Sequence, residues 1–117
     1  MDKKEKTEKR NVIAKALDLS NTRLKDDEVE KLFDFVSNPE KYNGKSKTHR
    51  TWREDWDHDG KYERTITDEY TLVNNSEAVG VQLHSETSDD GALTYSGDSF
   101  INTARGILKL LDYFSKS

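Results

Sequence analysis

Residues 48–73 constrain the fold more than any other stretch, because polar and apolar residues alternate there on both sides of an Asp-Gly pair. Successive side chains of a strand point to opposite faces, so this pattern predicts a β-hairpin. A loop of three residues, 58–60, with its glycine in a bulge, brings the aromatic residues of the two arms onto one face. The predicted cross-strand pairs are Trp56–Tyr62, Trp52–Ile66, Glu54–Arg64 and Arg50–Asp68.

Helical periodicity flanks this hairpin on both sides. Residues 1–10 are a mixed-charge tract that we expect to be frayed, and residues 11–42 form the helical N-terminal part. Its clearest helix starts with three acids and ends before Pro39, where a helix cannot continue. The strongest apolar stripe lies in a C-terminal helix over residues 99–116 and comprises Ile101, Ala104, Ile107, Leu108, Leu111 and Phe114.

Two further strands follow the hairpin. A loop over residues 74–77 predicts the pairs Leu72–Val79 and Tyr70–Val81, and a turn ending at Gly91 leads into a fourth strand. The predicted fold is therefore a single α+β domain over residues 1–117, in the order ααββββα. Its antiparallel meander of four strands occupies residues 46–97, with helices covering one face and the other face in water.

Composition narrows the class of protein. Only 32% of the 117 residues are hydrophobic and 36% are charged, so the core is small and leaves room for self-association into a homo-oligomer. The chain contains no cysteine, which excludes a disulfide framework and thiolate metal sites. No apolar run is long enough to span a bilayer and the first residues do not resemble a signal peptide, so we expect a cytoplasmic location.

Charge is distributed unevenly along the chain. The net charge is −4, but residues 54–98 contain 12 acidic and 2 basic residues, a local charge of −10. Residues 1–53 carry 14 basic and 10 acidic residues, a local charge of +4. Because the acidic segment coincides with the predicted sheet, we expect an acidic face that attracts basic proteins.

This charge map gives the main functional hypothesis, a non-enzymatic protein–protein interaction module. A specific version is a phage or mobile-element inhibitor that blocks a nucleic-acid-handling enzyme by imitating the charge of nucleic acid. The residues predicted to bind the partner are Asp55, Asp57, Glu63, Glu69, Glu86, Asp89 and Asp90.

A calcium-binding hairpin is the first alternative. Asp55, Asp57 and Asp59 alternate before Gly60, as carboxylates do at the start of an EF-hand loop, and Glu63 follows them. The similarity ends there, because Ile66 stands where a bidentate glutamate is needed and the flanks read as strands. An acidic hairpin turn explains the same residues without a metal.

Nucleic-acid binding through the basic N-terminal half is the second alternative. The residues concerned are the lysines near the N-terminus together with Lys41, Lys45, Lys47, Arg50 and Arg53, with Tyr42 and Trp52 nearby. Against it, lysines near the N-terminus alternate with glutamates. Catalysis has no support, since no nucleophile elbow, glycine-rich phosphate loop or zinc-type histidine spacing is present.

Overall fold

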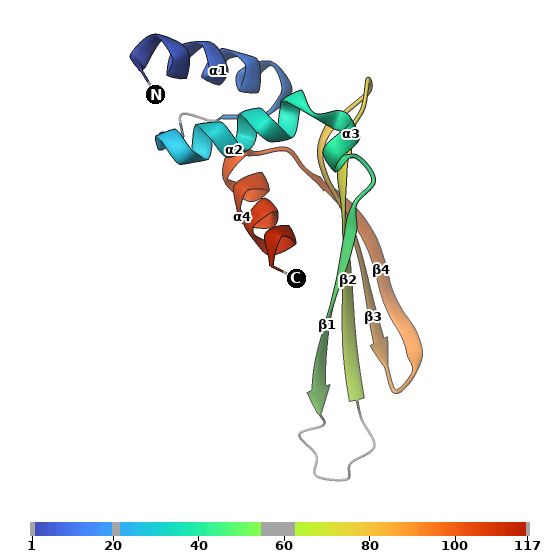
Figure 1. Ribbon diagram of the computed structural model, residues 1–117. Coiled ribbons are helices and arrows are strands. Elements are labelled where there is room, and N and C mark those ends of the chain that lie inside the picture. The colour runs from blue at the N-terminus through green and yellow to red at the C-terminus, as the bar shows by residue number, and fades with distance from the viewer. Residues whose placement is uncertain (1, 20–21, 55–62, 117) are drawn as a thin grey trace.

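The protein folds as an α+β structure with one open sheet of four strands (Figure 1). A computed structural model describes residues 2–19, 22–54 and 63–116, with the backbone alone at positions 53, 54 and 63. The elements are α1 (Lys3–Ala16), α2 (Asp26–Ser37), α3 (Pro39–Tyr42), β1 (Ser46–Glu54), β2 (Glu63–Asn74), β3 (Val79–Asp89), β4 (Ala92–Ile101) and α4 (Ala104–Ser115). The predicted fold class and meander are confirmed, with the short α3 as an addition.

The core lies between the helices and one end of one sheet face, which we call the inner face. Leu72 of β2 and Val81 of β3 are opposite each other there and fully buried. Phe35 of α2 and Ile107 of α4 pack into the same cluster. This packing gives both amphipathic helices a place to bury their apolar stripes, which is the main source of helix stability in a protein.

A buried asparagine and a lysine attach the helices to the sheet. The Asn74 side-chain amide donates to the carbonyl oxygen of Phe35 at 2.7 Å and so satisfies the C-terminal end of α2. The Lys47 ammonium donates to the carbonyl oxygen of Tyr113 at 2.9 Å and also to that of Lys116. Because α4 has no basic residue in its own last turn, Lys47 supplies the positive charge that a helix C-terminus favours.

The other half of the sheet extends beyond the helices, as Figure 1 shows for the lower ends of all four strands. The molecule measures 63 × 27 × 27 Å and has a radius of gyration of 18.0 Å. A compact domain of about 100 residues has a radius of gyration of about 13 Å. The described helices thus cover one end of the inner face, and none of them lies over the outer face (Figure 1).

The hairpin register differs by one residue from the prediction. Trp52 lies opposite Thr65 and Ile66 lies opposite Thr51, so Trp52 and Ile66 are on different faces. The register is set at the covered end, where the Gly44 N–H and the Lys45 carbonyl both bond to Leu72. Gly44 has a φ of +88°, which allows the chain to turn from α3 into β1 at that point. The predicted Trp56–Tyr62 pair lies outside the described residues.

Other boundaries also shift. Leu72 pairs with Val81 instead of Val79, because Asn75 closes the following loop by accepting from the N–H groups of Glu77 and Ala78. This shift of two residues keeps the predicted face. The tract expected to be frayed forms the first turns of α1, where the Asp2 side chain accepts from the Glu5 N–H at 2.7 Å. Ile101 ends β4, and α4 begins three residues later, after its N-cap Thr103.

Candidate protein-binding surface

The outer face of the sheet presents a row of polar residues from four strands. The register places Thr48, Glu69, His84 and Asp98 side by side across β1, β2, β3 and β4. Glu86 follows His84 on the same face of β3, because residues two apart in a strand share a face. His84 therefore has an acidic residue two positions along its own strand and one opposite it on each of the two neighbouring strands.

Both ring nitrogens of His84 contact carboxylates. Its Nδ1 lies 2.7 Å from an oxygen of Asp98, and its Nε2 lies 3.0 Å from an oxygen of Glu86. Only the doubly protonated imidazolium can donate to both, since a neutral ring has a single N–H. The hydrogen bond to Glu86 and then that to Asp98 raise the pKa of His84 above its ordinary value of 6.5.

The charge of this surface consequently depends on pH. Among the described outer-face side chains, Glu69, Glu86 and Asp98 are acidic and Arg50 is basic. These described side chains sum to −2 when His84 is neutral, from three negative and one positive groups, and to −1 when it is protonated. Of the other described acids of residues 54–98, Asp68 and Asp89 are on the inner face, and Glu77 and Asp90 are in the connections between strands.

Two of the predicted partner-binding acids lie together and two others lie elsewhere. Glu69 and Glu86 are exposed on the outer face beside His84. Asp89 is on the inner face, where its carboxylate accepts from Nε of Arg64 at 2.7 Å and from a second guanidinium nitrogen at 3.2 Å. Asp90 is in the β3–β4 turn with a φ of +52°. The row of acids on the outer face therefore includes neither Asp89 nor Asp90.

The remaining predicted acids belong to the calcium motif. Asp55, Asp57 and Asp59 lie outside the described residues, and Glu63 is described by its backbone, opposite Glu54. Within residues 2–19, 22–54 and 63–116, no group of three or more histidines and acids is arranged to hold a metal ion. The calcium hypothesis thus stays a prediction.

Sequence reasoning did not place Asp98 among the partner-binding residues. The Asp98 carboxylate, 63% exposed, belongs to a strand that was expected to end at residue 97. The alternation of Ser96, Asp98 and Phe100 indicates a strand that continues past residue 97. Ile101 also fits the apolar stripe of the predicted C-terminal helix, so the sequence pattern assigns residues 99–101 to that helix. His49 faces inward, with its ring 6.5 Å from that of Tyr113 in α4.

The same outer face carries apolar side chains near its projecting end. Trp52 of β1 is 61% exposed and Leu93 of β4 is 59% exposed. They lie in one row, because Trp52 is opposite Thr65, Thr65 is opposite Ser88, and Ser88 is opposite Leu93. Phe100, 43% exposed, lies further along β4 on this face. Exposed aromatic residues beside charged ones are typical of interaction surfaces.

Among the described side chains of this basic segment, those of Lys41, Lys47 and Arg50 do not form a common face, and the Arg53 side chain lies outside the described residues. The ammonium of Lys41 lies 2.8 Å from the Asp34 carboxylate, whereas Lys47 points inward to α4. Arg50 is on the outer face opposite Thr67. Since nucleic-acid binding depends on concentrated positive charge, this arrangement does not favour the second alternative.

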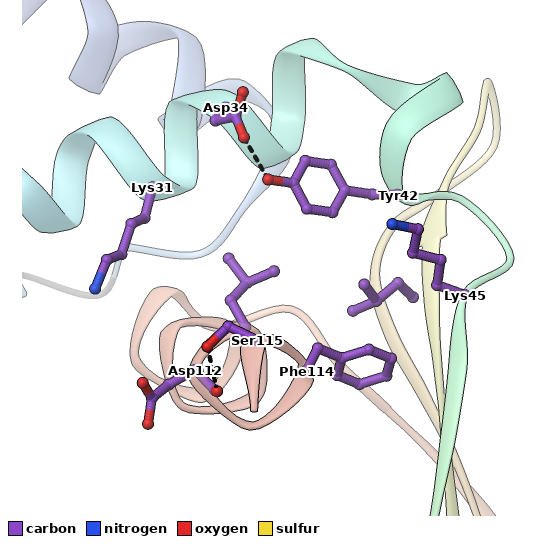
Figure 2. A pocket seen from close by; sticks show the side chains of 9 residues that line it. Lys31, Asp34, Tyr42, Lys45, Asp112, Phe114 and Ser115 are labelled. Atoms are coloured by element: carbon purple, nitrogen blue, oxygen red, sulfur yellow. Dashed lines mark hydrogen bonds between the residues drawn. The ribbon is translucent and has the colours of Figure 1, made fainter. Parts of the chain in front are cut away.

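A hollow of about 320 Å³ lies between α2, α3 and α4 (Figure 2). Figure 2 shows the Asp34 carboxylate and the Tyr42 hydroxyl facing each other on its wall, and the hydroxyl donates to the carboxylate. Hydrogen bonds from Lys41 and, to a smaller extent, from Tyr42 lower the pKa of Asp34. Burial is the main cause that raises the pKa of Tyr42. These directions keep Asp34 ionised and Tyr42 protonated, so the pair connects α2 to α3.

A second hollow, of about 420 Å³, is lined by residues of α4 and of the inner face. Its lining includes Tyr70, Leu83, Ile101, Leu110 and Tyr113, with His49 and Lys109 also present. The rings of Tyr70 and Tyr113 meet edge to face at 5.9 Å. The lining is mainly apolar, and it continues the packing of α4 against the sheet.

Comparisons with protein-family models, with curated proteins and with solved structures found no significant match to this chain. Within the described residues, no helix combines the length and apolar character needed to cross a bilayer. The physical properties of the outer face are therefore the basis for a functional proposal.

Proposed function

We propose that this protein is a non-enzymatic interaction module that binds a basic protein through the outer face of its sheet. The observation that supports this most directly is the contact of His84 with Glu86 and Asp98, with Glu69 opposite it, on a face over which no described helix lies. The interaction surface is defined here as these four residues together with Trp52, Leu93 and Phe100.

The two parts of the interaction surface have different roles in this proposal. Carboxylates attract a basic partner at a distance and orient it, which mainly raises the association rate. The exposed Trp52 provides apolar area that a partner can bury, and tryptophan is enriched among residues that dominate binding energy. Binding should thus depend on salt through the acids and on contact area through the aromatic residues.

The hypothesis of an inhibitor of a nucleic-acid-handling enzyme is a specific form of this proposal. Enzymes of that kind carry basic grooves that accept phosphate charge. A projecting sheet with carboxylates on one face is a shape that can enter such a groove. A cytoplasmic location belongs to the same proposal and rests on the absence of cysteine.

The test compares two charge-reversed variants as baits for proteins from a cell lysate, at low and at high salt. Glu69→Lys/Glu86→Lys alters the interaction surface, and Glu40→Lys/Glu77→Lys makes the same change in net charge on α3 and the β2–β3 loop. Both control positions are exposed. Circular dichroism checks that each variant keeps its fold.

We expect a basic protein to be retained by the native chain and by the control variant, to be released at high salt, and to be lost with the Glu69→Lys/Glu86→Lys variant. Equal retention by both variants would remove the outer face from consideration. Retention by neither would mean that net charge alone, and not this surface, attracts the partner.

A further inference from the structure

Strand β4 forms an edge of the sheet, and its composition differs from that of natural protected edges. The strand order is β1-β2-β3-β4, so β1 and β4 each have one side without a neighbouring strand. β4 runs for ten residues with no proline and with Asp98 as its one charged residue. Edge strands normally carry charges, proline or a cover that prevents another chain from pairing with them.

Alternate residues of β4 direct their main-chain N–H and C=O groups away from β3, toward the free edge of the sheet. A Cβ added to Gly80 of β3 would meet the Ile101 carbonyl oxygen, so this carbonyl points toward β3, whereas the next carbonyl, that of Asn102, accepts from the Asp18 N–H at 2.9 Å. Because the N–H and C=O groups of a strand alternate between its two sides, those of Ser96, Asp98 and Phe100 point the same way. Their side chains all lie on the outer face, beside His84 and Glu86.

The protein itself already uses the continuation of this edge for strand-like pairing. Asp18, after the end of α1, forms a bridge with Thr103, and its carbonyl accepts from the Ala104 N–H at 2.9 Å. That contact covers the line of β4 from residue 102 onward. Within the described residues, the edge from Ser96 to Phe100 has no strand beside it.

We propose that the partner of this protein contributes an extended basic segment, which adds to the sheet as a fifth strand along Ser96–Phe100. This inference rests on the proposed function, because it specifies how a basic partner would bind the same outer face. In strand addition, main-chain hydrogen bonds provide affinity, and alternate side chains of the added segment provide specificity.

Charge complementarity identifies the segment as basic. A residue of the added strand opposite Asp98 would have its side chain on the outer face, next to a carboxylate that is 63% exposed. The next outer-face side chain of the segment would lie opposite Ser96, and a long basic side chain there can extend across this small residue toward Glu86 on β3. Phe100, at the other end, offers an exposed ring to an aliphatic stem or an apolar side chain.

The opposite edge is a poorer receptor for such a segment. β1 carries Lys47, His49 and Arg50 within its first five residues, so a basic strand would meet like charges there. Lys47 is also occupied with the C-terminal carbonyls of α4. The two edges thus differ in charge, and of the two edge strands only β4 carries an acid of the interaction surface itself, Asp98.

The experiment measures binding of a synthetic ten-residue peptide of alternating threonine and lysine to the full chain. Two further peptides have methyl groups on the backbone nitrogens of either all threonines or all lysines. Each edge of an extended peptide carries the N–H groups of alternate residues, so only one of the two methylated peptides loses the donors that face β4. We expect the affinity of that peptide to fall by about tenfold or by a larger factor, while the other peptide retains its affinity.

A protein variant provides the complementary test. Ser96→Pro removes an outward N–H and places a ring on the free edge, whereas the bonds to β3 come from the neighbouring residues. We expect peptide binding to be lost in Ser96→Pro and retained in Ser96→Ala. Should Ser96→Pro fail to fold, the methylated peptides still decide the question.

The outcomes separate this inference from the proposed function. Equal affinity, or equal loss, for both methylated peptides would overturn strand addition. In that case, loss of partner binding by the Glu69→Lys/Glu86→Lys variant would still support the acidic surface. Selective loss with one methylated peptide but no effect of that charge reversal would support strand addition and contradict the acidic surface. Concentration-dependent dimers that Ser96→Pro abolishes would show that a second copy occupies the edge, which also overturns the proposal.

Discussion

The two halves of the sheet contain the same strands but have different surroundings. At the covered end, the inner-face row of Leu72, Val81 and Ile101 packs against α2 and α4. At the projecting end, the inner-face row of Thr51, Ile66, Thr87 and Tyr95 has no helix over it, and Tyr95 is 58% exposed. Alternation continues from one row to the other, so burial depends on the presence of a covering layer.

This difference shows how hydrogen bonding and local packing can maintain a sheet without a core beneath it. On the projecting half, Arg64 and Asp89 form a bidentate cross-strand pair, and the Ser85 hydroxyl donates to the Asp68 carboxylate at 2.5 Å. The Tyr95 ring lies over Gly97 and fills the space of the missing side chain. Such a half is free to meet a partner on either face or on its edge.

The largest expected effect is a loss of stability from a substitution in the core at the covered end. Phe35→Ala deletes a fully buried ring from the core, which should reduce the free energy of unfolding by about 3–5 kcal/mol. Tyr95→Ala deletes a similar ring from the projecting half and should cost less than about 1 kcal/mol. Urea denaturation measures both. A cost for Tyr95→Ala that matches that of Phe35→Ala would mean that the projecting half is packed against another chain.

A smaller effect is expected where the two halves meet. Lys47→Met keeps most of the aliphatic stem but removes the ammonium that caps α4, at a cost of about 1 kcal/mol. Hydrogen exchange should become faster in the last turn of α4 and stay unchanged in β3. Lys45→Met, at an exposed position two residues earlier, serves as the control and should alter neither property.

The smallest effect concerns the pH dependence of the outer face. The raised pKa of His84 means that the folded chain binds this proton more tightly than the unfolded chain. The stabilisation is fully present below the ordinary value of 6.5 and is lost as the pH rises through the raised pKa. His84→Gln should therefore lower the melting temperature at about pH 5.5 and leave it unchanged at about pH 9. An equal decrease at both values would contradict the imidazolium.

The arrangement of elements could be predicted from local signals. The acids and Pro39 bracket α2, the alternation in residues 63–74 marks β2, and glycine at position 91 marks the last turn. Each of these signals involves neighbours in the sequence. They therefore do not depend on contacts that only the folded chain provides.

Register and site membership could not be predicted in the same way. The hairpin register depends on Gly44 and Leu72, which lie outside the aromatic pairs from which it was predicted. A shift of one residue moves every β1 side chain to the other face, and this explains the error for Trp52. Asp98 joined the candidate site only because β4 continues to Ile101, and Asp89 left it because Arg64 holds it on the inner face.

The length of the projecting sheet also affects how the protein behaves in solution. A chain of 13.5 kDa that extends for 63 Å experiences more friction than a sphere of equal mass. It should elute early from a gel-filtration column calibrated with compact proteins, at the position of a larger species. A monomer would then be mistaken for a dimer, so subunit number has to come from light scattering or sedimentation equilibrium, which report mass independently of shape.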